Sequence, residues 1–141
     1  MPLFPEVDVG KTKENAKKVL RGYPRWRRIA NDFDGQKLTQ EYTFMPRNLS
    51  SRPSSPVEKL AIRRADAMLE LEAIEQAVSN IFDPYSRLIL FEKYLTRNPN
   101  KDYNIYSDLG LSESTYYDIL DRALLEFAEI YRNGEQVEIL E

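Results

Sequence analysis

The segment around Gly110 constrains the fold of this chain more than any other. Gly110 can adopt the left-handed conformation that ends an α-helix. Ser112 can accept a backbone hydrogen bond as the N-cap of the helix that follows. Leu111 stands between them, where its side chain can fill the angle between the two helices. The sequence therefore predicts a short helix, a glycine turn and a longer capped helix, which is the layout of a helix-turn-helix.

The segment after Ser112 has one apolar face, because its apolar residues recur at steps of three and four positions. They are Tyr116, Ile119, Leu120, Ala123, Leu124, Phe127 and Tyr131. This stripe has to pack on the apolar segments that precede it, so we expect an all-α helical bundle. We expect Leu111, Ile119, Leu124 and Phe127 in its core. The same pattern also fits an ordinary three-helix core that has no role in DNA binding.

The opposite face of this segment begins with side chains that can form hydrogen bonds. A helix-turn-helix presents the N-terminal turns of its second helix to the major groove of DNA. The residues expected to contact DNA there are Ser112, Glu113, Ser114, Thr115, Tyr117, Asp118 and Arg122. Tyr117 is singled out among them, because the sequence offers no other reason for an exposed tyrosine at this position.

Two runs of residues near the C-terminus resemble a known family. The runs are LGLSESTYY from Leu109 to Tyr117 and ALLEFAEIY from Ala123 to Tyr131, and they look like the C-terminal part of the ArpU-type regulators. These are phage and prophage proteins of Gram-positive bacteria that control late genes for packaging and lysis. The segment is more distantly similar to the promoter-reading domain of bacterial sigma factors. The resemblance implies a sequence-specific transcriptional regulator that binds double-stranded DNA.

Tyr106 departs from the usual helix-turn-helix pattern. The first helix of the motif normally has a small residue one turn before the glycine, so that the two helices can approach each other. Tyr106 occupies that position here. We therefore expect either that the two helices are splayed apart or that the register is shifted by one residue.

Composition excludes several classes of function. The chain of 141 residues contains neither histidine nor cysteine, which removes disulfides, the usual zinc ligands and the usual catalytic base–nucleophile pairs. We therefore expect no enzyme activity, no cofactor and no metal. No apolar run approaches the ~18 residues of a membrane span, and no signal peptide is visible. These absences favour a cytoplasmic protein, within the bacterial host cell that the resemblance implies.

Charge is distributed very unevenly along the chain. Residues 1–64 contain 14 basic and 7 acidic side chains, whereas residues 102–141 contain 2 basic and 10 acidic ones. Phosphate contacts supply most non-specific affinity for DNA, so an acidic helix-turn-helix needs positive charge from elsewhere. The nearest cations are Arg87, Lys93, Arg97 and Lys101, which we expect to contact phosphate. The second source is a cluster of Lys11, Lys13, Lys17, Lys18, Arg21, Arg25, Arg27 and Arg28, which is either a phosphate-contacting arm or a solvated helix face.

The chain is expected to have four parts. Residues 1–50 form a basic arm or small subdomain, residues 51–56 a linker rich in Ser and Pro, residues 57–134 the helical domain, and residues 135–141 a frayed acidic tail. Within the first part we expect a helix over 13–21 capped by Thr12, a second helix over 25–30 and a short strand over 38–44. Helices are also expected over 56–80, capped by Ser55, and from Pro84, capped by Asp83.

Two other interpretations remain open. The chain could be a protein-interaction module that docks on RNA polymerase or another phage protein without reading DNA. A homodimer is considered because the apolar residues Leu60, Ala67, Leu71, Ile74, Val78 and Ile81 follow nearly heptad spacing. Packing of this seam within its own domain is the simpler explanation.

Overall fold

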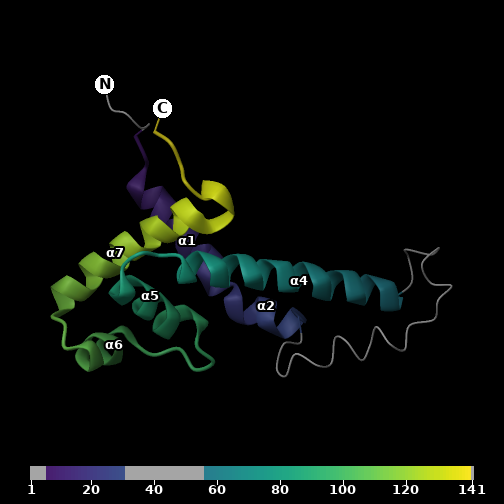
Figure 1. Ribbon diagram of the computed structural model, residues 1–141, viewed down its shortest axis with the longest axis horizontal. Coiled ribbons are helices and arrows are strands. Elements are labelled where there is room, and N and C mark those ends of the chain that lie inside the picture. The colour runs from purple at the N-terminus through teal and green to yellow at the C-terminus, as the bar shows by residue number, and fades with distance from the viewer. Residues whose placement is uncertain (1–5, 31–55, 141) are drawn as a thin grey trace. The chain divides into compact units, whose positions relative to one another are not determined.

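The computed structural model describes residues 6–30 and 56–140 of the chain, and these ranges are almost entirely helical (Figure 1). The predicted all-α class is therefore confirmed. The elements are α1 Val9–Arg21, α2 Tyr23–Ala30, α4 Pro56–Ser79, α5 Pro84–Leu90, the π-helical turn η2 Phe91–Leu95, α6 Asp102–Leu109, α7 Glu113–Ile130 and the 3-10 turn η3 Tyr131–Gly134. The strand expected over 38–44, the Ser55 cap and most of the linker over 51–56 lie outside the described residues.

The described residues form two compact units. Residues 6–23 and 73–140 make one unit, which we call the main unit, and residues 24–30 and 56–72 make the other. The sequence pattern predicts that residues 1–50 are separate from the helical domain. The structure instead groups α1 with α7 in the main unit.

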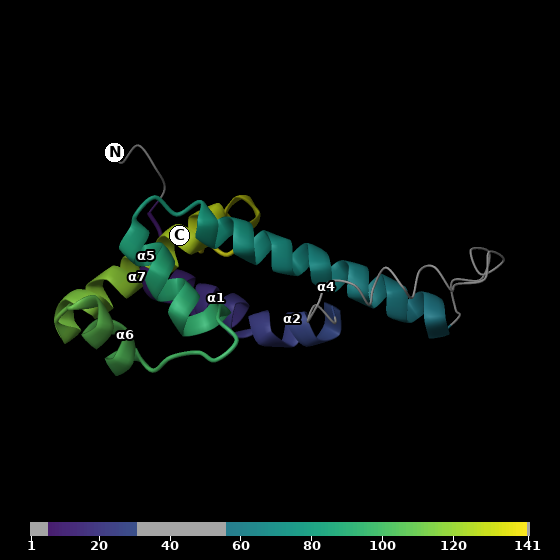
Figure 2. The same cartoon turned by 60° about the horizontal axis from the view of Figure 1, so that its bottom comes forward.

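Helix α7 is the centre of the main unit. It contacts α1, α5, α6 and η3, and both views show α1 and α5 lying along it (Figures 1 and 2). Its predicted apolar stripe, from Tyr116 to Tyr131, is buried throughout. Leu20 of α1 and Ile89 of α5 are fully buried as well. Of the four residues named for the core, Leu111 is the exception: it is only half-buried, because it lies in the turn.

Two helices begin where a side chain can cap them. Asp83 caps α5 as predicted, since its Oδ1 accepts from the backbone N–H of Tyr85 at 3.2 Å, and Pro84 takes the first position. The predicted cap of α1 was wrong. The cap is Asp8, whose Oδ1 accepts from the N–H of Lys11 at 3.1 Å. Thr12 lies inside the helix on its buried face, because Asp8 offers a stronger cap one turn earlier.

Helix α4 follows the boundaries that the sequence indicates, beginning at Pro56 and ending at Ser79. Most of its apolar seam is buried, namely Ala67, Leu71, Ile74, Val78 and the following Ile81. Leu60 is exposed. The burial agrees with packing of this seam within the chain.

The C-terminal residues pair with the N-terminal ones. The N–H of Asp8 donates to the carbonyl of Glu138 at 2.8 Å, and the N–H of Leu140 donates to the carbonyl of Glu6 at 2.9 Å. Thr12 Oγ1 accepts from the N–H of Glu138 at 3.0 Å. The prediction of a frayed tail was therefore wrong. The reason is that paired backbones and the polar side chain of Thr12 satisfy its hydrogen bonds, which no local sequence pattern reveals.

Replacing Phe127 with alanine should lower the free energy of unfolding by about 3–5 kcal/mol. Phe127 is fully buried, and its ring stacks on Tyr131 with centroids 5.3 Å apart. Urea denaturation of the full chain measures the loss. Leu125→Ala, at a half-buried position of the same helix, should cost less. A loss below ~1 kcal/mol for Phe127→Ala would show that this face of α7 is not the core.

Candidate nucleic-acid interface

The turn between α6 and α7 is built around Gly110. Gly110 has φ 69° and ψ 28°, which is the left-handed conformation predicted for it. Its N–H donates to the carbonyl of Ser107 at 3.1 Å, and the N–H of Leu111 donates to the carbonyl of Tyr106 at 2.9 Å. This pair of bonds is a Schellman motif. A Cβ at Gly110 would meet no atom within 4 Å, so the turn needs glycine for its φ angle and not for space.

Ser112 caps α7 as the sequence predicts. Its Oγ accepts from the N–H of Thr115 at 3.2 Å, and its hydroxyl lies 2.9 Å from Thr115 Oγ1. Helix α7 begins at the next residue, Glu113. The cap and the first residue of α7 are therefore the ones that the sequence predicts.

Tyrosine rings fill the space where a small residue is usual. Tyr106 lies 5.4 Å from the ring of Tyr116 and 5.5 Å from that of Tyr103, between centroids. The rings of Tyr116 and Tyr117 are 5.0 Å apart at an angle of 78°. Such contacts between aromatic rings are favourable. The contact between Tyr106 and Tyr116, whose rings are tilted by 49°, joins α6 to α7.

The carboxylate of Asp102 ties three elements together. It accepts from Tyr116 Oη of α7 at 2.5 Å and lies 2.7 Å from Lys93 Nζ of η2. Tyr117 Oη donates to it at 3.3 Å. We call these four residues the Asp102 network. Sequence reasoning missed it, because its members lie up to 24 positions apart in the chain and no spacing rule connects them.

Protonation of the Asp102 network is well defined. Burial by itself would raise the pKa of Asp102, but the hydrogen bonds from Lys93, Tyr116 and Tyr117 outweigh it and hold that pKa below its ordinary value. Burial, and then the hydrogen bond to Asp102, raises the pKa of Tyr116. The network is therefore an ionised carboxylate with neutral phenols at neutral pH.

The candidate base-contacting residues are exposed together at the start of α7. They are Ser112, Glu113, Ser114, Thr115, Tyr117, Asp118 and Arg122. Tyr117 is 40% exposed, and its hydroxyl forms an exposed hydrogen bond to Asp102 at 3.3 Å. Whether these residues contact DNA stays a prediction.

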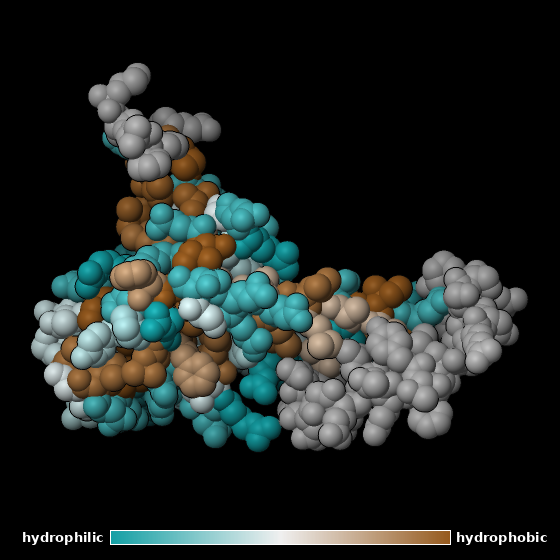
Figure 3. Space-filling view, in the orientation of Figure 1, coloured by the Kyte–Doolittle hydropathy of each residue, from teal (hydrophilic) through white to brown (hydrophobic). Residues whose placement is uncertain are grey.

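Apolar and pale side chains gather over the end of the main unit that carries α5 and α6 (Figure 3). Tyr85, Leu88 and Phe91 are exposed there, and so is Tyr103 of α6. Phe82, just before α5, is 93% exposed. Arg87 holds the loop that presents Phe82, since its guanidinium donates to the carbonyls of Ile81 and Phe82 at 2.7 and 3.1 Å.

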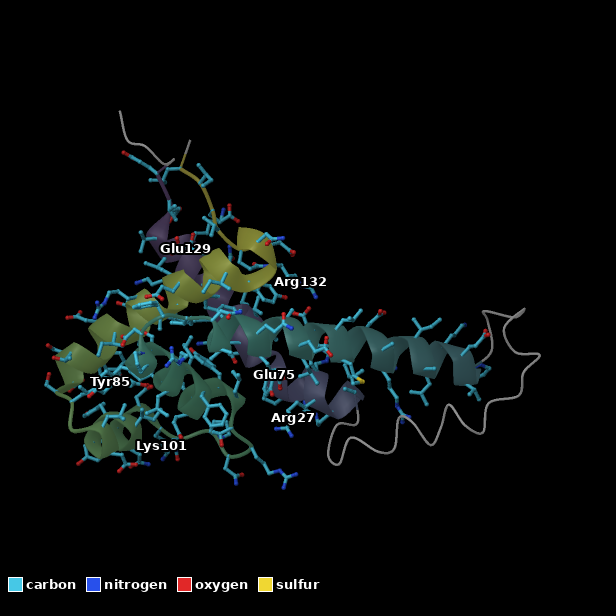
Figure 4. All side chains as sticks on the ribbon, in the orientation of Figure 1. Arg27, Glu75, Tyr85, Lys101, Glu129 and Arg132 are labelled. Atoms are coloured by element: carbon cyan, nitrogen blue, oxygen red, sulfur yellow. The ribbon has the colours of Figure 1, made fainter. Side chains whose placement is uncertain are left out.

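The four cations expected to contact phosphate have different environments. The ion pair with Asp102 leaves the Lys93 side chain only 24% exposed, so its charge is balanced inside the network. Arg87 is half-buried against the loop carbonyls. Arg97 and Lys101 are exposed, and within residues 6–30 and 56–140 no hydrogen bond or ion pair holds their side chains. Lys101 lies beside α6, whereas Glu129 and Arg132 lie at the C-terminal end of α7 (Figure 4).

Helix α1 adds cations that the sequence placed in a basic N-terminal arm or small subdomain. Lys11, Lys18 and Arg21 are exposed on α1. Lys13 of the same helix lies 3.5 Å from Asp121 of α7. The main unit therefore carries its own basic residues. Among the described residues, no group of acidic side chains could hold a metal ion, and none of the helices is long and apolar enough to cross a membrane.

Replacing Asp102 with asparagine should lower the free energy of unfolding by about 2–3 kcal/mol at pH 6, because charge-assisted hydrogen bonds are removed. The pKa of Asp102 is lower in the folded chain than its ordinary value of 3.8. Its stabilisation is therefore present above pH 3.8 and disappears as the pH falls through the folded pKa. Denaturation at several pH values should show the difference from wild type narrowing below pH 3.8.

Asp108→Asn is the matched control, since Asp108 is exposed on the same helix. It should change stability little at any pH. A pH-independent difference between Asp102→Asn and wild type would contradict the role of the carboxylate charge.

Comparison with known proteins identifies relatives along nearly the whole chain. A protein of Streptococcus phage O1205 named as the autolysin regulatory protein ArpU is 48% identical over 135 residues, which cover 96% of this chain and 97% of the relative. A protein of Enterococcus hirae with the same name is 30% identical over 134 residues, covering 95% and 96%. No family model and no solved structure matches. The resemblance seen in the sequence is thus confirmed, and the chain belongs to the ArpU family of regulatory proteins.

Proposed function

We propose that this protein is a sequence-specific regulator of phage or prophage late genes that binds double-stranded DNA and reads the major groove with the first turns of α7. The observation that carries the proposal is the turn at Gly110 followed by the Ser112 cap. This arrangement exposes a continuous polar surface at the start of a helix whose other face is buried. That is how a recognition helix is presented. The relatives' names, which refer to regulation of an autolysin, agree with a target among lysis genes.

The phosphate contacts of this interface come from outside the first turns of α7. Arg97 and Lys101 precede α6, and Lys11, Lys18 and Arg21 lie on α1. Lys93 contributes little, because Asp102 balances its charge at 2.7 Å. Phosphate contacts fix position and supply affinity, whereas base contacts select the sequence. Affinity for DNA therefore comes mainly from α1 and the segment before α6, whereas selection of the sequence comes from the start of α7.

A second candidate function is docking on RNA polymerase or another phage protein without reading DNA. The near-complete exposure of Phe82, on a loop that Arg87 holds in place, favours it. The carboxylates of Glu113 and Asp118 are also unsuited to phosphate. Binding to duplex DNA at low salt distinguishes the two candidates, since a docking module would bind no duplex.

The double substitution of Ser114 and Tyr117 by alanine should weaken binding to the preferred duplex about tenfold or more, because a base contact typically contributes ~1–3 kcal/mol of discrimination. Binding to unrelated duplexes should change little. Fluorescence anisotropy measures both, and circular dichroism checks the fold. Glu129→Ala, at an exposed position in the last turns of α7, is the control. An unchanged order of preference in the double variant would contradict this assignment.

Replacing Lys11, Lys18 and Arg21 with glutamine should weaken binding to every duplex, because it removes cations and leaves the base-contacting residues intact. The slope of log affinity against log salt should flatten by about 0.9 for each phosphate that is no longer neutralised. Salt titrations of the full chain measure this slope. Point substitutions are needed, because truncation would remove the buried Ala16 and Leu20 from the core.

The control for these titrations is Lys59→Gln with Arg63→Gln. Both residues are exposed on the part of α4 that belongs to the other unit. Equal slopes for the α1 variant and the wild type would mean that α1 never meets phosphate. The order of preference among sequences should be the same in all three proteins.

A further inference from the structure

The exposed start of α7 has an unusual chemical composition for a DNA-reading surface. Purines are most often read by arginine or lysine at guanine and by asparagine or glutamine at adenine. None of these residue types occurs between Ser112 and Asp118. Arg122 is the first, and it lies about one turn beyond Asp118 along the helix. The side chains that reach outward first are carboxylates, hydroxyls and one aromatic ring.

The aromatic ring is that of Tyr117, and the structure fixes how it is presented. Its hydroxyl lies 3.3 Å from Asp102, and its ring packs edge-on against Tyr116 with centroids 5.0 Å apart. Two contacts thus restrain a side chain that is 40% exposed, so that its aromatic ring is available to a partner. In the major groove, only thymine offers an apolar group, its 5-methyl.

The carboxylates are those of Glu113 and Asp118. Both are exposed, and within the described ranges no hydrogen bond or ion pair involves either of them. An ionised carboxylate can only accept hydrogen bonds. In the major groove the amino groups of cytosine and adenine are donors, whereas thymine and guanine present acceptors. Carboxylates commonly contact cytosine, because adenine places its N7 acceptor beside its amino group and a carboxylate cannot donate to it. A carboxylate brought against an acceptor would lose its water and gain no partner, which is costly.

Two of these three side chains are neighbours on the helix surface, because Glu113 and Tyr117 are four residues apart. Asp118 lies about 100° farther round the helix from Tyr117, so it would contact a different base. We propose that the start of α7 reads pyrimidines: the ring of Tyr117 contacts a thymine methyl, and Glu113 and Asp118 accept from cytosine amino groups. This inference rests on the proposed function and names the bases which that site selects.

The test begins with the full-length protein and a randomised duplex library, from which the preferred duplex is selected at low salt. That duplex is then synthesised with deoxyuridine in place of each thymidine in turn, which removes a single methyl group. At one or two positions the wild type should lose about fourfold in affinity, the effect expected for one buried methyl. Tyr117→Ala should bind the thymidine and deoxyuridine duplexes equally.

Tyr117→Phe is the matched control, because it keeps the ring and removes only the hydroxyl. It should still discriminate thymidine from deoxyuridine. Glu113→Gln tests the second half of the inference, since an amide both donates and accepts. It should lose preference for cytosine at one position of the site and gain affinity for adenine there.

The outcomes separate this inference from the proposed function. Selective binding that ignores deoxyuridine at every position would overturn the pyrimidine assignment and leave DNA binding standing. Loss of discrimination in Tyr117→Phe would overturn it too, because the hydroxyl would then be the reader. Absence of binding to any duplex at low salt would overturn both.

Discussion

The carboxylate of Asp102 is the contact on which the candidate interface depends. It joins η2 through Lys93 and α7 through Tyr116, while it opens α6 itself. Charge-assisted hydrogen bonds are stronger than neutral ones, and the lowered pKa of Asp102 keeps it charged at neutral pH. The third bond, from the hydroxyl of Tyr117, restrains an exposed side chain at the start of α7. The chemistry presented by α7 therefore follows from an interaction beneath it.

The same contact has an electrostatic consequence. Lys93 lies near the start of α7, but its charge is balanced by Asp102 at 2.7 Å. Positive charge for a nucleic-acid partner then has to come from other residues, and α1 carries exposed lysines and arginines in the same unit. Buried Ala16 and Leu20 hold α1 in that unit, and so does the pairing of residues 6–8 with 138–140. The C-terminal tail thus helps to fix the helix that carries these cations.

Local features of this fold could be predicted from the sequence, and distant pairings could not. The turn and the helix caps involve only residues that are close together in the sequence, so a local pattern predicts them. They are formed by Gly110, by Ser112 and by the Asp83-Pro84 pair. The Asp102 network joins residues from three elements, and the tail meets the N-terminus across the whole sequence. Thr12 illustrates the difference: it is a good cap by residue type, but its hydroxyl serves Glu138 instead. The exposed set of candidate site residues was predictable from helical periodicity, whereas the hydrogen bond from the Tyr117 hydroxyl to Asp102 was not.

An acidic surface at the start of α7 need not weaken a regulator. At the proposed interface, Glu113 and Asp118 would lower affinity for every duplex, because carboxylates repel phosphate and lose water on contact. The carboxylates would regain hydrogen bonds only at bases that offer donors. Binding to a wrong sequence would therefore be weakened more than binding to the right one. Discrimination in a genome depends on the ratio of specific to non-specific binding and not on affinity alone. Carboxylates at the start of α7, with cations on α1, would raise this ratio by limiting attachment to unrelated DNA.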